Sequence, residues 1–481
     1  MSRMAAAEMG GRGGGRMATA RIEPPQAARE GRRPELDAIR TLVVLGLVFF
    51  HSSLVFDTRD DFYVKNAETT EVTTIFAGLG GVWAMPMLFL ISGLGAWHSL
   101  RRRSPGGFAA ERLLRLGVPL VFAIVTIIPV PQWLRLRADP AYHESYLRFL
   151  PRFFDVHWDL SQFPFVLQGE YFEAGHLWFI VLLLAFSLML APVVRWFPRD
   201  LAHRILDRLA SAVRWRGAVL TAAVPVALLS ALAGLEEAYA AWNRWAYLVF
   251  FVYGFLLAAD ERFRTAMRRD AVPAAVLGAV MFLIGLPGFL AASDVPGGDP
   301  FTDMTALAIG ARALYGAAGW CWLVAILGLL DRRRSAPAAE PATPPEPAAI
   351  PEQTATSEQP APPDQAAPFA QAVRTGQGSL TGQAPSPGQA PPAGQVQAGQ
   401  VQAGGRRRWL YGYLAAAVLP LYVLHQPIVV TVAYGLVGWD LPILVKFVAI
   451  VAVSLVLTLA AYEVLVRRTR VTRFLFGMRT R

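Results

Sequence analysis

The stretch LDAIRTLVVLGLVFFHSS, residues 36–53, indicates the class of the whole protein. It is apolar along almost its full length, yet it contains Arg40 and His51. This spacing corresponds to about three helical turns, so the two side chains lie on one helix face, separated by a rise of ~16 Å. An ionisable side chain at membrane depth is costly and is a functional candidate by default. The stretch therefore predicts a membrane helix with a polar path along one face.

Apolar segments recur along the chain. It has 481 residues, of which 54% are hydrophobic, and its mean hydropathy is +0.38. Segments of about 20 apolar residues are long enough to cross the ~30 Å hydrocarbon layer. We therefore predict an all-α polytopic membrane protein with about ten transmembrane helices, at residues 38–56, 76–98, 115–131, 176–195, 218–235, 244–259, 272–292, 304–330, 409–434 and 441–466.

The basic residues indicate the orientation. Of the 45 Lys and Arg residues, all but Lys65 and Lys446 are Arg. They gather in the N-terminal tail, in every second connection and in the C-terminal tail, whereas the alternate connections are mostly acidic. By the positive-inside rule both termini are cytoplasmic, 57–75 and 132–175 lie outside, and the protein is a multi-pass protein of the inner (plasma) membrane. The net charge of +10 is thus a topology signal, and we expect no nucleic-acid partner, because no basic domain exists.

Composition divides the chain into four parts. Residues 1–33 are predicted to be a disordered basic tail, and residues 34–334 a membrane core with the first eight spans. Residues 335–405 are rich in Pro, Ala, Gln and Gly, which predicts a disordered cytoplasmic linker with little apolar surface to bury. Residues 406–481 contain the last two spans and a basic tail.

Several motifs in a fixed order resemble one family of membrane enzymes. PELDAIRTLVVLGLVFFHSS (34–53) has an Arg, ten residues and then a His, and MPMLFLISGLGAW (85–97), ERLLRLGVPL (111–120) and GHLWFIVLLL (175–184) follow. Together they resemble the membrane acyltransferase-3 family. LPLYVLHQPIVV (419–430) and YEVLVRRTRVTRFLFG (462–477) are similar to the last helices of its periplasmic glucan succinyltransferase subgroup.

The resemblance implies a reaction and its substrates. It implies an acyltransferase that moves an acyl group, of acetyl or succinyl type, from cytoplasmic acyl-CoA to a hydroxyl of an extracytoplasmic glycan or lipid-linked sugar. The expected partners are the lipid bilayer, acyl-CoA as donor substrate, and a polysaccharide or glucan acceptor. We expect no bound cofactor and no metal, because the seven His residues show no metal-binding spacing.

His51 is the predicted catalytic residue. Imidazole titrates near neutrality, so it can act as general base for a sugar hydroxyl, or it can carry the acyl group covalently. The sequence leaves both roles open. The alternative for a single membrane histidine is a structural hydrogen bond between helices.

Arginines are the predicted donor-binding residues. Arg40 would hold the phosphate or pantetheine part of acyl-CoA, although it could instead be a topology anchor, and Asp37 would orient it or cap the helix. Arg112 and Arg115 lie three residues apart on one helix face and would seat the nucleotide, since Arg suits phosphate.

The remaining polar residues of the spans receive weaker predictions. His176 and His425 are predicted to support the site on its acceptor side, with Pro427 interrupting the helix beside His425. Ser92-Gly93 is predicted to serve helix packing rather than nucleophilic catalysis. Glu463 and Arg467 are predicted to form an ion pair.

A different class of protein fits part of the pattern. In a transporter or flippase, Arg40 and His51 would line a path for substrate or protons. Transporters often carry internal inverted repeats. We find no matching pair of segments in the two halves of this chain, which favours the enzyme.

Overall fold

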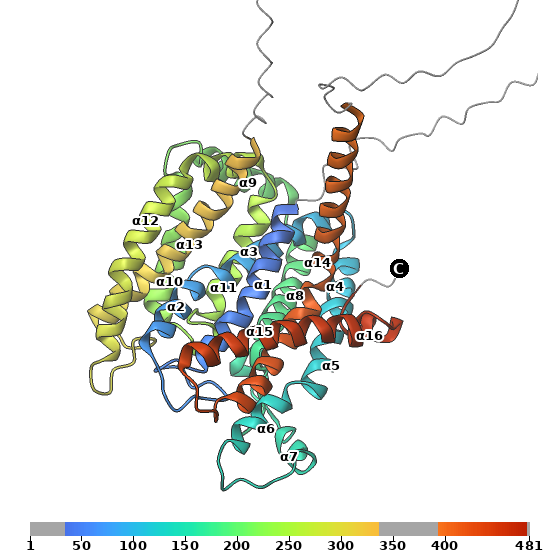
Figure 1. Cartoon of the computed structure of the whole chain (residues 1–481). Helices are drawn as coiled ribbons and strands as arrows, with labels where there is room; N and C mark the ends of the chain where they lie inside the picture. Colours follow the sequence, from blue (N-terminus) through green and yellow to red (C-terminus); the bar gives the residue numbers. More distant parts are fainter. Residues whose placement is uncertain (1–33, 336–392, 479–481) are drawn as a thin grey trace, which may run out of the picture.

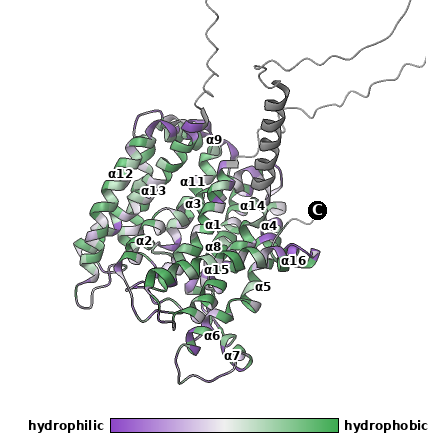
Figure 2. Ribbon diagram, viewed as in Figure 1, coloured by the Kyte–Doolittle hydropathy of each residue, from purple (hydrophilic) through white to green (hydrophobic). Residues whose placement is uncertain are grey.

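The computed structural model describes residues 34–335 and 393–478 as a bundle of helices (Figure 1). Eight helical segments of this part are long and apolar enough to cross a membrane, namely Glu35–Leu54, Glu71–Leu100, Pro105–Arg137, Gly175–Trp196, Glu261–Ser293, Ala306–Arg333, Gly412–Leu436 and Ile443–Val466. Hydrophobic residues cover most helices, and hydrophilic residues gather at the ends of the bundle (Figure 2). The protein is therefore all-α and polytopic, as predicted.

The two other predicted spans form shorter helices. Residues 218–235 form a 3-10 turn η5 (Ala218–Ala222) and α10 (Ala223–Ala233), and residues 244–259 form α11 (Arg244–Leu257). The 14 residues of α11 rise only ~21 Å, less than the hydrocarbon thickness. The total of about ten transmembrane helices and the cytoplasmic placement of the termini stay predictions.

The elements run in chain order as follows. The first part contains α1 (Pro34–Leu54), α2 (Glu71–Gly81), α3 (Ala84–Leu100), α4 (Pro105–Arg112), the π-helical turn η2 (Leu113–Gly117), α5 (Val118–Thr126), α6 (Pro129–Arg137) and α7 (Tyr146–Phe153). After a short hairpin come the 3-10 turn η4 (Gly175–Leu177), α8 (Trp178–Trp196), α9 (Arg199–Ala212), α12 (Glu261–Ser293), α13 (Ala306–Ser335), α14 (Ala393–Leu436), α15 (Ile443–Ala461), the π-helical turn η7 (Tyr462–Val466) and α16 (Arg470–Leu475). The antiparallel hairpin pairs β1 (His157–Trp158) with β2 (Leu167–Gln168), and the 3-10 turns η3 (Leu160–Gln162) and η6 (Glu237–Tyr239) complete the list.

α14 begins earlier than the sequence analysis predicted. Its first residues, 393–405, belong to the segment predicted to be a disordered linker. The Ala and Gln residues of GQVQAGQVQAGG favour a helix, whereas its four glycines disfavour one, and the helix continues through this stretch beyond its apolar part. The rest of the predicted linker, 336–392, and the predicted tail 1–33 lie outside the described residues.

α3 is largely buried, and glycines let α11 approach it closely. A Cβ atom on Gly93 would lie 1.9 Å from the carbonyl oxygen of Phe251, and one on Gly254 would lie 1.9 Å from that of Leu90. The hydroxyl of Ser92 donates to the Leu88 carbonyl of its own helix at 2.7 Å. The packing role predicted for Ser92-Gly93 therefore agrees with these contacts, which also hold the short α11 inside the bundle.

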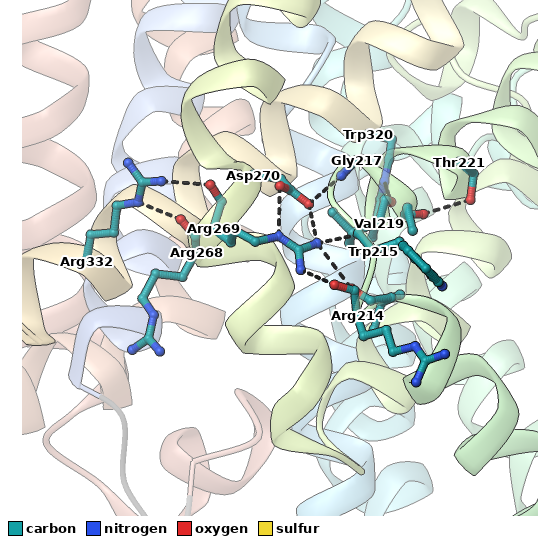
Figure 3. A network of polar contacts seen from close by, with 12 residues as sticks. Arg214, Trp215, Gly217, Val219, Thr221, Arg268, Arg269, Asp270, Trp320 and Arg332 are labelled. Atoms are coloured by element: carbon teal, nitrogen blue, oxygen red, sulfur yellow. Dashed lines mark hydrogen bonds and ion pairs between the residues drawn. The ribbon is translucent and has the colours of Figure 1, made fainter.

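A polar network fastens the connection after α9 to α12 (Figure 3). The guanidinium of Arg269 binds the Asp270 carboxylate and donates to the backbone carbonyls of Val213, Arg214 and Trp215. Asp270 also accepts the backbone N–H of Gly217 at 3.0 Å, where a positive φ of 77° suits glycine. One arginine thus binds three successive backbone carbonyls of the connection that follows α9.

Two further polar contacts involve arginines of the helices. Glu463 and Arg467 form the predicted ion pair at 2.9 Å. Arg312, on α13, is fully buried and donates to the carbonyls of Pro300 and Ala231 at 3.0 and 2.9 Å. It therefore links the connection before α13 to the end of α10.

We expect that Gly254→Val destabilises the protein, because its side chain would collide with the backbone of α3 rather than with a movable side chain. Overpacking of this kind costs roughly 1–3 kcal/mol. Thermal unfolding in detergent measures it. Gly46→Ala is the matched control, since a Cβ at Gly46 meets no atom within 4 Å. Equal melting temperatures for the two variants would contradict the close α3–α11 contact.

Candidate active site

Three histidines that are far apart in the sequence lie together. The ring centroid of His425, on α14, is 5.1 Å from that of His51 and 5.1 Å from that of His176. His425 and His176 are buried, and His51 is partly buried near the end of α1. The structure thus brings the predicted catalytic histidine and both predicted supporting histidines into one cluster.

A proline on α14 explains how His176 is held. Pro427 has no N–H, so the carbonyl of Val423, four residues earlier, lacks its helical donor. His176 Nε2 lies 3.0 Å from that carbonyl oxygen. The backbone of His176 is held as well, because its N–H donates to Gln426 Oε1 at 3.3 Å and its carbonyl accepts from the Tyr422 hydroxyl. The motifs GHLW and VLHQP are therefore joined by hydrogen bonds in the fold.

These contacts determine which ring nitrogens are basic. A carbonyl oxygen only accepts, so the nitrogen that faces it carries the proton. His176 then has its proton on Nε2, and His425 has its proton on Nδ1, which lies 2.6 Å from the Tyr422 carbonyl oxygen. The opposite nitrogens, Nδ1 of His176 and Nε2 of His425, are buried and have no hydrogen-bond partner, and the same holds for Nδ1 of His51. The cluster therefore holds three buried imidazole nitrogens that have no hydrogen-bond partner.

The connection between α1 and α2 covers the cluster. Phe62 stacks on His51 with ring centroids 5.8 Å apart, and the next residue, Tyr63, donates its hydroxyl hydrogen to Glu173. Glu173 lies three residues before His176. Burial raises the pKa of the Glu173 carboxyl group. The sequence analysis did not identify Tyr63, Glu173 or Gln426. The sequence indicated Glu173 and Gln426 only by their position close to the histidine motifs.

Both lysines of the chain hold this covering connection in place. Lys65 Nζ donates to the carbonyls of Leu54 and Asp60, each at 2.9 Å. Lys446 Nζ, on α15, donates to Asn66 Oδ1 at 2.8 Å. Burial, followed by the charge of Asp57, raises the pKa of Asp60 to about 7, so the outer surface of this connection changes charge near neutrality.

Arg40 lies on the same helix toward its other end. It donates to the Ile91 carbonyl on α3 at 2.9 Å and pairs with Asp37 at 3.4 Å, as the three-residue spacing predicted. A Cβ on Gly95 would lie 3.5 Å from the Arg40 guanidinium, an ordinary van der Waals contact. The Arg40 side chain therefore lies against the ISGLG stretch of α3.

The two other predicted donor-binding arginines lie near Arg40. Arg40, Arg112 and Arg115 interact electrostatically with one another. Arg112 lies over the Phe108 ring at 5.0 Å with its Nε buried and unpaired, and Arg115 pairs with Glu111 at 3.5 Å. Arg115 belongs to the π-helical turn η2, and such turns are frequent at functional sites. The structure therefore collects positive charge at one end of α1 and imidazoles at the other.

The histidine cluster does not have the arrangement of a metal site. Within the described residues, no three His, Cys, Asp or Glu side chains could hold a metal ion together. Two of the imidazoles bind backbone carbonyls through one nitrogen each, which leaves the other nitrogen for proton transfer or for attack on a carbonyl group.

Comparisons with known proteins agree with the motifs. A family model described as an acyltransferase domain matches residues 33–338, which is more than half of the chain. The matched region contains His51, His176 and the three arginines, and it ends before α14 and His425.

The chain is also similar to proteins named glucans biosynthesis protein C. The relative from Salmonella gallinarum is 26% identical over 253 residues, which cover 52% of this chain and 58% of the relative. Those from Salmonella paratyphi B and Salmonella schwarzengrund are 25% identical over the same shares. The match thus spans somewhat more than half the length of these curated relatives. No solved structure matches the chain.

We expect Pro427→Ala to release His176 from α14. The new N–H would compete for the Val423 carbonyl, and the net value of one hydrogen bond, about 0.5–1.5 kcal/mol, corresponds to a roughly 2- to 10-fold change in the ratio of His176 tautomers. Nitrogen NMR of ¹⁵N-histidine-labelled protein measures this ratio. Pro420→Ala, on the same helix, is the matched control. An unchanged His176 tautomer in Pro427→Ala would show that the proline does not determine the anchor.

Proposed function

The chain belongs to the membrane acyltransferase-3 family, and on this premise we propose that it is an integral-membrane O-acyltransferase. It moves an acetyl- or succinyl-type group from acyl-CoA to a hydroxyl of a glycan or lipid-linked sugar on the outer side of the inner membrane. The observation that carries the proposal is the separation, along α1, of an arginine group from a histidine cluster. These are the chemical requirements of a phosphate-bearing donor and of a hydroxyl acceptor.

The donor end uses Arg40, Arg112 and Arg115. Acyl-CoA is polyanionic, and arginines bind phosphate through charge-assisted hydrogen bonds. Bringing three guanidinium groups together is unfavourable unless an anion joins them, and Glu111 and Asp37 offset only part of their charge. The rise of ~16 Å between Arg40 and His51 is similar to the length of an extended pantetheine arm, so the thioester reaches the histidines.

The acceptor end uses the imidazoles. In direct transfer, an unprotonated ring nitrogen of His51 takes the proton of the sugar hydroxyl while its oxygen attacks the thioester carbon. The C–O bond forms, the C–S bond breaks, and the imidazolium gives its proton to the thiolate of CoA. In the covalent alternative, His51 nitrogen first takes the acyl group and CoA leaves, and the hydroxyl then attacks the acyl-imidazole.

His425 and His176 support either route. Nε2 of His425 is unpaired and its ring contacts His51, so it accepts a proton or orients the His51 ring. The unpaired Nδ1 of His176 accepts a hydrogen bond from a second hydroxyl of the sugar. A glucan is the acceptor class that the names of the relatives favour.

The rival function is a transporter or flippase that uses Arg40 and His51 as a polar path. The acyltransferase family match disfavours it, and the filling of the outer end of α1 by Phe62 disfavours an open path. The two functions differ in one measurable respect, which is the formation of an ester on the acceptor.

We expect Arg40→Lys to weaken the binding of acyl-CoA more than the binding of the acceptor, because Lys keeps the charge but loses the planar guanidinium. The KM for acyl-CoA should rise roughly tenfold, the value of about one charge-assisted hydrogen bond, with the KM for the acceptor nearly unchanged. Arg101→Lys, at an exposed position, is the matched control. An unchanged donor KM would make Arg40 a topology anchor.

We expect His51→Gln to fold and to bind acyl-CoA, yet to lose acyl transfer. Removal of a general base lowers the rate by a factor of about 10²–10⁴, and removal of an acyl carrier nearly abolishes it. Purified protein in nanodiscs, with separate assays of donor binding and ester formation, measures both. His143→Gln, in the exposed connection before α7, is the control. Transfer at the wild-type rate by His51→Gln would refute the assignment and favour the transporter.

A further inference from the structure

The segment between α6 and α8 forms a cap at one end of the bundle. α6 and α7 project beyond the other helices on the side away from the start of α1 (Figure 1). An open cavity of about 290 Å³ lies between the end of α7 and the two segments that flank the hairpin β1–β2. Its lining includes the polar side chains of Arg152, Asp155, His157, Glu170 and Tyr171. Neither the motifs nor the proposed catalytic chemistry assigns a role to this cavity, which we name the cap pocket.

The cap pocket is fixed in shape. Arg152 donates to Glu144 Oε2 at 2.7 Å and to the Tyr171 hydroxyl, and its guanidinium lies 4.5 Å from the centroid of the Tyr171 ring. A Cβ on Gly169 would lie 2.6 Å from the Asp155 carbonyl oxygen. Only glycine therefore allows these two segments to approach, and their contact keeps the shape of the cavity without a ligand.

The chemistry of the lining favours sugar hydroxyls over a charged ligand. Carboxylates of Asp155 and Glu170 accept hydrogen bonds, and His157 and Tyr171 both donate and accept. The one cation of the lining, Arg152, is already paired with Glu144. An anionic ligand would meet two carboxylates, whereas a neutral ligand with many hydroxyls finds acceptors and donors together.

The cap pocket lies close to the histidine cluster along the chain. Tyr171 precedes His176 by five residues, which span at most ~17 Å even when fully extended. The Tyr63–Glu173 hydrogen bond holds the middle of this segment. An acceptor of a few sugar units is long enough to span this separation.

We propose that the cap pocket binds a neutral oligosaccharide part of the acceptor, next to the sugar that is acylated. This inference rests on the proposed function and names a specificity site for it. The pocket would not take part in bond making. It would raise the affinity for an extended acceptor and leave the chemical step unchanged.

The test uses the full-length protein in nanodiscs and neutral gluco-oligosaccharides of increasing length. Binding without acyl-CoA is measured by equilibrium dialysis, and acyl transfer is measured to a monosaccharide and to the longest oligosaccharide. The variants are Glu170→Gln with Asp155→Asn, and Gly169→Val, whose side chain would collide with the Asp155 backbone and distort the pocket. Trp158→Ala is the matched control, because Trp158 is 73% exposed on the hairpin but lies outside the lining.

The expected result is weaker oligosaccharide binding in both pocket variants, by roughly tenfold for lost hydrogen bonds to charged groups. The KM for the oligosaccharide should rise by a similar factor, with kcat and monosaccharide transfer unchanged. Wild-type binding in the pocket variants, absence of binding to wild-type protein, or preference for an anionic oligosaccharide would overturn the pocket assignment. Oligosaccharide binding without acyl transfer to any acceptor would instead refute the proposed function and leave the pocket standing.

Discussion

The hydrogen bond between His176 and the Val423 carbonyl is the contact on which the candidate site depends. A bilayer supplies no water to satisfy a free carbonyl, so the gap that Pro427 makes in α14 has to be filled by another helix. His176 fills it, and in doing so it joins the start of α8 to the middle of α14. The Tyr422 hydroxyl and the Gln426 amide strengthen this junction. His425 is then carried to a position where its ring contacts both other histidines.

This junction also determines the chemistry available. Carbonyl partners hold the protons of two imidazoles on known nitrogens, which leaves the opposite nitrogens as acceptors. A carboxylate partner would have made the imidazoles more basic and more often charged. The neutral partners keep them suited to receiving a proton rather than to holding one. Phe62 and the connection anchored by Lys65 and Lys446 separate them from the outer surface.

Close packing at α3 provides the second constraint. α11 approaches α3 closely because Gly93 has no side chain, and Arg40 donates to the Ile91 carbonyl of the same short stretch. Helices in a membrane gain little from burying apolar surface against each other, so such close contacts supply much of the association energy. One short motif, ISGLG, therefore serves both the bundle and the placement of the arginine.

The sequence by itself determined the membrane class, most of the spans and the alignment of Arg40 with His51, because these follow from local periodicity, length and charge. It also predicted the local pairs, Asp37 with Arg40 and Glu463 with Arg467, since residues three or four apart meet on a helix. It named His176 and His425 as candidate site residues. It did not show that they meet His51, because His425 is separated from His51 by most of the sequence. Only tertiary structure decided the partners of Arg312, the covering role of Tyr63 and Lys65, and the reason for Pro427. Each of these contacts depends on which helices are neighbours, and the packing of the whole bundle determines the neighbours.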